Sequence, residues 1–256
     1  MRLIADTHVH FYPCYDLRQA FSNLRNCLSA LDRNALIMGF LAERHDCHYF
    51  KELRENSGLL GNGITVRGDD TVLVISEQGY PDLYLFAGRQ IITSERIEIL
   101  ALTTDMEIAD GLPADDIISA VREKEGIPVV SWAPGKWFFR RKHVVASLID
   151  SYEPGTLLFG DTTLRPVGWM EPFLMQRAVR KGFGLIAGSD PLPFGGEEKM
   201  MGRYAVLLES DFDPENPTVS IRTAFTRPEF SPKRIGKRGS VPETLSRLFK
   251  NARSKK

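Results

Sequence analysis

Two histidines and a carboxylate stand close together near the start of the chain, in the run Asp6-Thr7-His8-Val9-His10. The apolar residues 3–5 just before them predict a short buried strand. Alternate side chains of a strand point to the same face, so Asp6, His8 and His10 are expected to project together. Imidazole nitrogens and carboxylates are ligands for zinc, manganese or iron. The run therefore predicts a metal site, against the alternative of a polar strand end with two surface histidines.

Further candidate ligands stand at or within other predicted strands. His45 follows the apolar run 34–41, Asp190 ends the run Gly188-Ser189-Asp190, and Glu98 lies within a β-rich segment. A metal would lower the pKa of a bound water to about 7, and Asp190 could be a last ligand or the base for that water. The predicted metal ligands are His8, His10, His45, Asp190 and Glu98, with Asp190 and His45 as catalytic residues.

Several of these residues also have a structural interpretation. His45 lies between Arg44 and Asp46, which fits a salt-bridged surface turn, and the run 45–48 could instead form a local zinc site. Glu98 alternates with apolar neighbours, as expected on the solvent face of a strand. Asp161 ends another predicted strand, a position that also fits the start of a turn.

Two cations are candidates for binding an anionic substrate group. Arg44 belongs to the polar run after the second predicted strand, and Lys136 lies in a loop between Trp132 and Trp137. The loop fits a pocket lining and equally fits ordinary packing. Arg44 and Lys136 are therefore predicted as substrate-binding residues, with a small anionic molecule as the expected substrate.

Strands and helices alternate over most of the chain. Apolar spacing predicts helices over 17–31, 112–125, 140–151, 172–181 and 243–251, and strands over 3–5, 34–41, 127–131, 156–161, 184–190, 205–208 and 218–221. Residues 58–104 are β-rich and predict an antiparallel insertion. Polar residues recur at strand ends, where β/α barrels carry their active sites. The pattern predicts an α/β fold of the distorted TIM-like β/α barrel type, and the missing Gly-x-Gly-x-x-Gly and P-loop motifs argue against nucleotide cofactors.

Composition and charge place further bounds on the protein. Among 256 residues, 43% are hydrophobic and 26% charged, as in an ordinary globular protein. Three cysteines without CxxC spacing fit a reducing compartment, and no apolar run of transmembrane length or signal-peptide pattern is found. These features predict a cytoplasmic location and no membrane partner.

The C-terminal residues 227–256 are strongly basic. They hold ten Lys and Arg against two Asp and Glu, a net charge of +8, which leaves −8 on the remaining residues. Such a tail can be a solvated end, an arm for nucleic acid or another acidic partner, or an assembly element with its short helix. We expect one domain over 1–226, containing the β-rich insertion at 58–104, followed by this extension at 227–256.

The motifs together resemble the PHP family, named for polymerase and histidinol phosphatase. The resemblance rests on four runs: Asp6-Thr7-His8-Val9-His10, Glu43-Arg44-His45-Asp46, the strand Ile127 to Pro134, and Gly188-Ser189-Asp190-Pro191. It covers roughly residues 1–210 and implies a metal-dependent phosphoesterase on a distorted barrel related to the amidohydrolases.

The chain departs from the family pattern at three ligand positions. Gln90 stands where the family has a metal-bridging Glu, Ala133 or Trp132 where it has a His, and Pro191-Leu192 where it has Ala-His. The resemblance therefore implies a reduced site with one or two divalent ions (zinc, manganese or iron) in place of three. The sequence predicts a metal-dependent hydrolase, of phosphate esters before amides, that uses a metal-activated water. The alternative is an inactive PHP-like binding protein whose basic tail contacts nucleic acid or another acidic partner.

Overall fold

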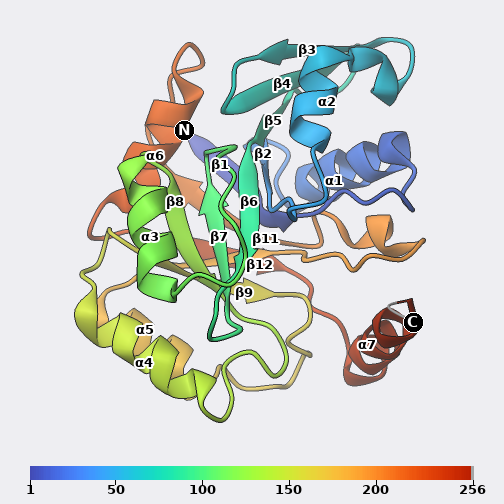
Figure 1. The fold of residues 1–256 in the computed structure, drawn as a ribbon. Helices are drawn as coiled ribbons and strands as arrows, with labels where there is room; N and C mark the ends of the chain where they lie inside the picture. The colour runs from blue at the N-terminus through green and yellow to red at the C-terminus, as the bar shows by residue number, and fades with distance from the viewer. Residues whose placement is uncertain (255–256) are drawn as a thin grey trace.

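The computed structural model describes residues 1–254, whose strands form two mixed sheets (Figure 1). The seven-stranded sheet has the order β12-β11-β1-β2-β5-β4-β3, and the five-stranded sheet has the order β10-β9-β8-β7-β6. The strands are β1 (Arg2–Val9), β2 (Leu36–Leu41), β3 (Ile64–Gly68), β4 (Val72–Glu77), β5 (Leu83–Phe86), β6 (Gly88–Ile92), β7 (Glu98–Leu102), β8 (Ile127–Ser131), β9 (Leu158–Thr162), β10 (Leu185–Gly188), β11 (Tyr204–Glu209) and β12 (Lys233–Gly236).

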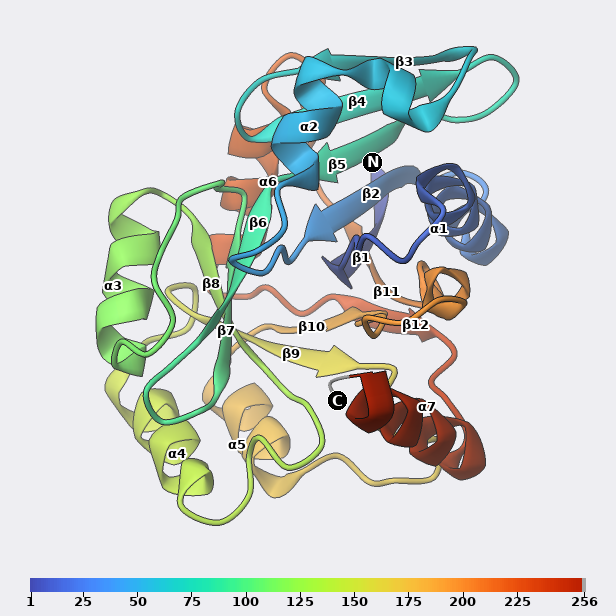
Figure 2. The same ribbon diagram turned by 45° about the vertical axis from the view of Figure 1, so that its right-hand side comes forward.

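Helices α1, α3, α4 and α5 lie against the outer faces of the two sheets, as the turned view shows (Figure 2). Their apolar stripes pack on strands, α1 on β1 and β2, and α3 on β7 and β8. A separate apolar cluster lies between the two sheets and contains residues such as Met38, Leu100 and Val206. The helices are α1 (Leu17–Leu31), α2 (Tyr49–Glu55), η1 (Ser57–Leu60), α3 (Ala114–Glu123), α4 (Arg141–Ser151), α5 (Phe173–Lys181), η2 (Glu197–Met200), α6 (Pro217–Thr226) and α7 (Val241–Ser254).

The prediction of a TIM-like barrel is wrong, because the strands of residues 1–254 form two sheets and no closed ring. The free edge of β1 pairs antiparallel with β11, from Arg2 opposite Glu209 to Ala5 opposite Val206. In a closed barrel, β10 would pair with this edge of β1, but β11 already occupies it. The α/β class holds, and β1, β2, β5 and β8, β9, β10 form the parallel parts of the two sheets.

Two seams nevertheless bring the sheets together beside β1 and β2. At the first, the Asp190 amide donates to the His8 carbonyl at 2.9 Å, and Thr7 Oγ1 donates to the Ala187 carbonyl at 2.9 Å. At the second, an isolated bridge joins Glu43 and Arg89. The ends of β1 and β10 therefore lie side by side, which positions the residues described below.

The strand predicted over residues 218–221 is wrong, since this segment lies in α6. Pro217 occupies the first turn, and Ile221, Ala224 and Phe225 are buried at helical spacing. Burial of this face overrides the β-branched composition of the segment. Strand β12 and helix α2 were not predicted.

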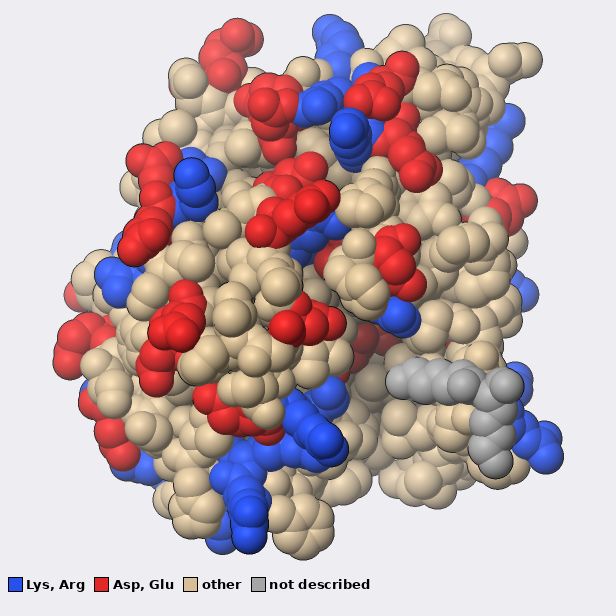
Figure 3. All heavy atoms as spheres, in the orientation of Figure 1, with Lys and Arg blue, Asp and Glu red and all other residues tan. Residues whose placement is uncertain are grey.

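Acidic and basic side chains are interspersed over the face of the molecule in Figure 3, with basic side chains grouped toward its lower edge. Within residues 1–254, no helix has the length and apolar character needed to cross a membrane.

Candidate metal centre

His8, His10 and Asp190 form a buried group that could hold a metal ion, with one ligand atom from each within 4.8 Å of the others. The two Nε2 atoms are 3.0 Å apart, and Asp190 Oδ1 lies 3.7 Å from His8 Nε2 and 3.6 Å from His10 Nε2. Ligands about 2.0–2.1 Å from a tetrahedral ion lie roughly 3.3 Å from one another. The three separations bracket that value, so the donor set fits one divalent ion.

A β-bulge at the end of β1 determines which side chains reach this group. Asp6 pairs with Gly39 of β2, but the next registered pair is Val9 with Leu41, so the simple alternation of the strand is broken. Asp6 turns away from the histidines and accepts backbone N–H groups from His8 at 3.2 Å, Ser189 at 2.8 Å and Gly202 at 2.8 Å. It fastens three segments together and is no member of the ligand group.

Asp190 reaches the histidines because β10 approaches β1 unusually closely. A Cβ at Gly188 would lie 2.4 Å from the backbone nitrogen of His8, so only glycine allows this approach. Asp190 itself has a φ of 47°, in the left-handed region that Asp tolerates better than most residues. The small residue before Ser189 and Asp190 thus lets the backbone of β1 approach β10.

Neighbouring side chains hold the two imidazole rings in place. Ser131 Oγ lies 3.3 Å from Nδ1 of His8, which leaves Nε2 of that ring facing the group. His10 stacks on Tyr12 with ring centroids 5.3 Å apart. Gln90 Oε1 lies 3.1 Å from His8 Nε2 and adds an amide oxygen beside the three candidate ligands.

Burial and charge favour the ligand forms of these residues. Burial lowers the pKa of His10, so its ring is neutral near pH 7 and offers a lone pair. Burial alone would raise the pKa of Asp190, but the nearby His8, His10 and Arg247 hold it below its usual value. A neutral imidazole beside an ionised carboxylate is the state that a divalent metal requires.

A pocket of about 610 Å³ opens over the group, and the other predicted site residues lie on its walls. Glu98 is buried, and its Oε1 is 2.9 Å from Lys136 Nζ. Arg44 Nε lies 3.3 Å from Asp46, and His45 Nδ1 lies 3.8 Å from Asp110 with two thirds of its side chain exposed. Glu98, Lys136, Arg44 and His45 thus line the pocket while each faces another charged partner.

Side-chain contacts decide the roles of residues 45–48 and of Asp161. The side chains of His45, Cys47 and His48 face Asp110, Asp46 and Arg89 respectively, so they do not converge on a common ion. Asp161 is buried at the end of β9, where Arg165, Arg234 and Tyr204 donate to it. It is part of a structural ion-pair network.

Residues at the site that had no predicted role include Gln90, Ser131 and Arg247. In the sequence, Gln90 was noted only as a departure from the pattern of the family that the motifs resemble. In the structure its amide oxygen faces the site. Ser131 ends a predicted strand, which is a usable signal. Arg247 lies in the basic extension, where its charge is indistinguishable from that of a solvated tail; in the structure it is buried against Glu197, with Arg247 Nη2 2.7 Å from Oε2.

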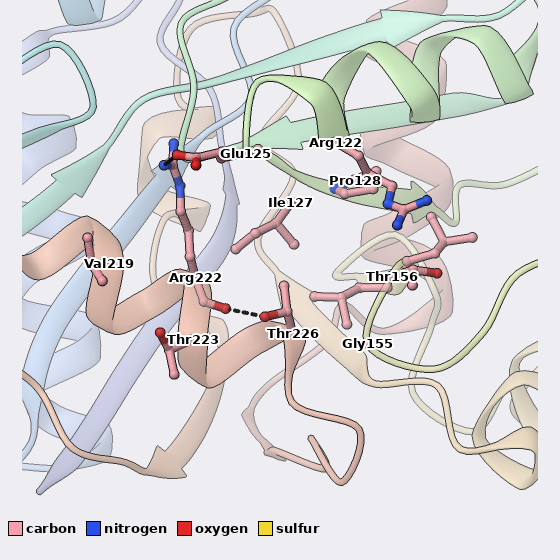
Figure 4. Close-up of a pocket in the computed structure, with 13 residues that line it drawn as sticks. Arg122, Glu125, Ile127, Pro128, Gly155, Thr156, Val219, Arg222, Thr223 and Thr226 are labelled. Carbon is pink, nitrogen blue, oxygen red and sulfur yellow. Dashed lines mark hydrogen bonds and ion pairs between the residues drawn. The ribbon is translucent and has the colours of Figure 1, made fainter.

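A second pocket, of about 440 Å³, lies at the opposite ends of β8 and β9 (Figure 4). Arg222 and Glu125 pair at 2.9 Å on its wall, and Arg222 also donates to Thr103. The lining residues of this pocket include none of the predicted metal ligands.

No family model matches the sequence, and no curated protein matches it. Among solved structures, PsfC from Pseudomonas syringae PB-5123 is similar with a TM-score of 0.62 and 13% identity, over 99% of this chain and 98% of PsfC. This likeness shows a shared fold over the whole described length. The resemblance to the PHP family continues to rest on the motifs themselves.

Endonuclease Q is a more distant structural neighbour. The lesion-specific endonuclease from Pyrococcus furiosus gives a TM-score of 0.47 at 12% identity, and endonuclease Q bound to a 27-mer duplex with an abasic lesion gives 0.46 at 12%. This chain covers 56% of each, so it spans little more than half their length. Scores this low support no inference about activity.

Proposed function

We propose that this protein is a metal-dependent hydrolase of phosphate esters with one divalent ion bound by His8, His10 and Asp190. The observation that carries the proposal is the convergence of Nε2, Nε2 and Oδ1 from the ends of β1 and β10 in a buried group. Such an ion, when bound, polarises the ester and lowers the pKa of a water molecule. Gln90 lies close enough to His8 to serve as a neutral fourth ligand.

The surrounding residues supply orientation and a route for the proton. Ser131 and Tyr12 hold the two rings, so the site is formed before substrate arrives. Asp190 is the nearest carboxylate to both rings, and its second oxygen is the proposed acceptor for the proton of the attacking water. Because the group is buried, the charges act in a medium of low dielectric constant.

The pocket walls support an anionic substrate through exchange of ion-pair partners. Lys136 faces Glu98 and Arg44 faces Asp46, so each cation already has a carboxylate partner. A phosphate group entering the pocket can replace these carboxylates as the acceptor. The substrate-binding role of Arg44 and Lys136 follows from this exchange and remains part of the proposal.

The alternative of a nucleic-acid-binding tail gains less support from the contacts. Two arginines of the extension are used inside the protein, Arg234 against Asp161 and Glu171, and Arg247 against Glu197. Their charges are therefore neutralised by near neighbours, which weakens the long-range attraction of phosphates.

Metal analysis combined with an activity assay tests the proposal. We expect the purified protein to hold about one zinc, manganese or iron ion and to hydrolyse a p-nitrophenyl phosphate mono- or diester. The double variant His8→Ala/His10→Ala should lose both, whereas His143→Ala, on the exposed face of α4, should lose neither. A wild-type protein that binds no divalent ion, or activity that survives the double substitution, would contradict the proposal.

A further inference from the structure

The C-terminal helix α7 forms one wall of the pocket above the candidate metal centre. Leu248, Asn251 and Ser254 of α7 line the same pocket as His10 and Asp190. In the turned view, α7 lies beyond the ends of β9 and β10, next to the loops that follow these strands (Figure 2). The helix therefore combines an apolar and two neutral polar side chains on a surface that a substrate would meet.

One buried side chain, Arg247, fastens this helix to the body. Its side chain is 5% exposed, and the guanidinium donates to both carboxylate oxygens of Glu197 at 2.7–3.0 Å. Nη1 donates to Thr163 Oγ1 at 2.9 Å, after β9, and Nη2 donates to the Asp190 carbonyl at 3.2 Å, after β10. A bidentate buried pair of this kind fixes geometry as well as adding energy.

Glu197 carries the same constraint to the loop that follows Asp190. Its Oε2 accepts the amide of Leu192 at 3.0 Å, so the Arg247–Glu197 pair spans residues 190–192. The Asp190 amide is held separately by the His8 carbonyl at 2.9 Å. The backbone of Asp190 is thus bound on both sides while it keeps a left-handed φ, a conformation that is unfavourable for a residue other than glycine when unsupported.

We infer that Arg247 is a positioning residue that keeps the Asp190 carboxylate aimed at His8 and His10, and that α7 is a working wall of the site. This inference rests on the proposed function for its metal, but its structural core concerns residues 189–192 alone. The positive charge of Arg247 is then used in a buried ion pair within the protein. The substrate is expected to present neutral polar groups toward Asn251 and Ser254 and its anionic group toward Lys136.

Three variants of the full chain test this inference. Arg247→Gln removes the guanidinium, Arg247→Lys keeps the charge but loses the two-pronged contact, and Arg253→Gln is a matched change on the exposed side of α7. Zn²⁺ and Mn²⁺ titrations measure the metal dissociation constant, and hydrogen exchange measures protection of the amides of Ser189, Asp190 and Leu192. These three amides are hydrogen-bonded in the structure.

We expect Arg247→Gln to speed exchange of these amides and to weaken metal binding, each at least tenfold, with Arg247→Lys intermediate and Arg253→Gln equal to wild type. Should Arg247→Gln fail to fold, Arg247→Lys alone carries the comparison with Arg253→Gln. Unchanged exchange and unchanged metal affinity in a folded Arg247 variant would overturn the inference. If the wild type binds no metal, the proposed function falls, and the exchange data alone decide whether Arg247 holds Asp190.

Discussion

The Nε2 atoms of His8 and His10 lie 3.0 Å apart in a buried group, although only one residue separates them at the end of β1. Two imidazole nitrogens at this distance either share a proton or point their lone pairs at a common ion. The carboxylate of Asp190, 3.6–3.7 Å from both, favours the ion.

This convergence predicts that divalent metal stabilises the folded protein. At a free concentration 100 times its dissociation constant, an ion that binds only the folded state adds about 2.7 kcal/mol to the free energy of unfolding. Thermal unfolding with and without Zn²⁺ or Mn²⁺ measures the effect. His143→Ala should keep the stabilisation and His8→Ala/His10→Ala should lose it; an equal gain in both variants would mean that metal binds elsewhere.

Gln90→Glu is expected to destabilise the metal-free protein and to tighten metal binding. The Gln90 amide oxygen lies 3.1 Å from His8 Nε2, so a carboxylate there adds negative charge beside Asp190. The metal-free variant should unfold at lower temperature, because like charges repel in a partly buried site. Metal titration should show at least tenfold tighter binding than wild type. Equal affinity would place Gln90 outside the ligand shell.

Asp6→Asn is expected to destabilise the fold by about 2 kcal/mol, because an amide offers only one oxygen to the three N–H groups that Asp6 accepts. Urea unfolding measures the change. Asp46→Asn, an exposed carboxylate in the same chain, should change stability by less than about 0.5 kcal/mol. Equal effects of the two substitutions would count against the tethering role of Asp6.

Glu43 predicts a specific pH dependence of stability. Burial raises the pKa of Glu43 from 4.5 to about 7, although the Phe50 amide and Arg89 act in the opposite direction. The folded state therefore binds this proton more tightly than the unfolded chain. The contribution of Glu43 is complete below pH 4.5 and is lost as pH rises to about 7.

The variant Glu43→Gln isolates this contribution. Relative to it, the wild type should lose up to ~3 kcal/mol of unfolding free energy between these two pH values and show no further relative loss above them. Urea unfolding at a series of pH values gives the two curves. Parallel curves across the whole range would refute the assignment.

The three thiols are expected to react in a fixed order. Cys14 is exposed, whereas Cys47 is buried, and burial with nearby Asp46 and Glu43 raises the pKa of Cys47 to about 12. The thiolate is the reactive form, so Cys47 should react last with a disulfide reagent in the folded protein. Cys14→Ser should remove the fastest phase, and Cys47→Ser should leave it intact. A fast phase lost with Cys47→Ser would contradict the burial of that thiol.

Local patterns in the sequence predicted most elements and pointed to the three residues of the candidate metal centre. His8 and His10 could be identified from their spacing after an apolar strand, and Asp190 from the small residues before it. Asp6 was misplaced because a bulge in β1, which depends on pairing with β2, breaks the alternation. The sequence around Asp6 contains no sign of that bulge.

Local sequence patterns could not predict which segments pair with each other over long distances along the chain. The barrel prediction failed because β11 pairs with β1 from more than two hundred residues away, and periodicity identifies strands without their neighbours. Arg247 escaped prediction for a similar reason. Its partner Glu197 is fifty residues distant, and a basic run has the same pattern whether its members face solvent or a buried carboxylate.

The pairing of β1 with β11 has a consequence for synthesis of the chain. At about 5–20 residues per second, β1 leaves the ribosome roughly 10–40 seconds before β11 can cover its edge. During most of that interval the apolar strand β1, which contains His8, has β2 as its early partner. The nascent chain must keep this edge from pairing with other chains, and Asp190 can join His8 and His10 only after β10 has emerged.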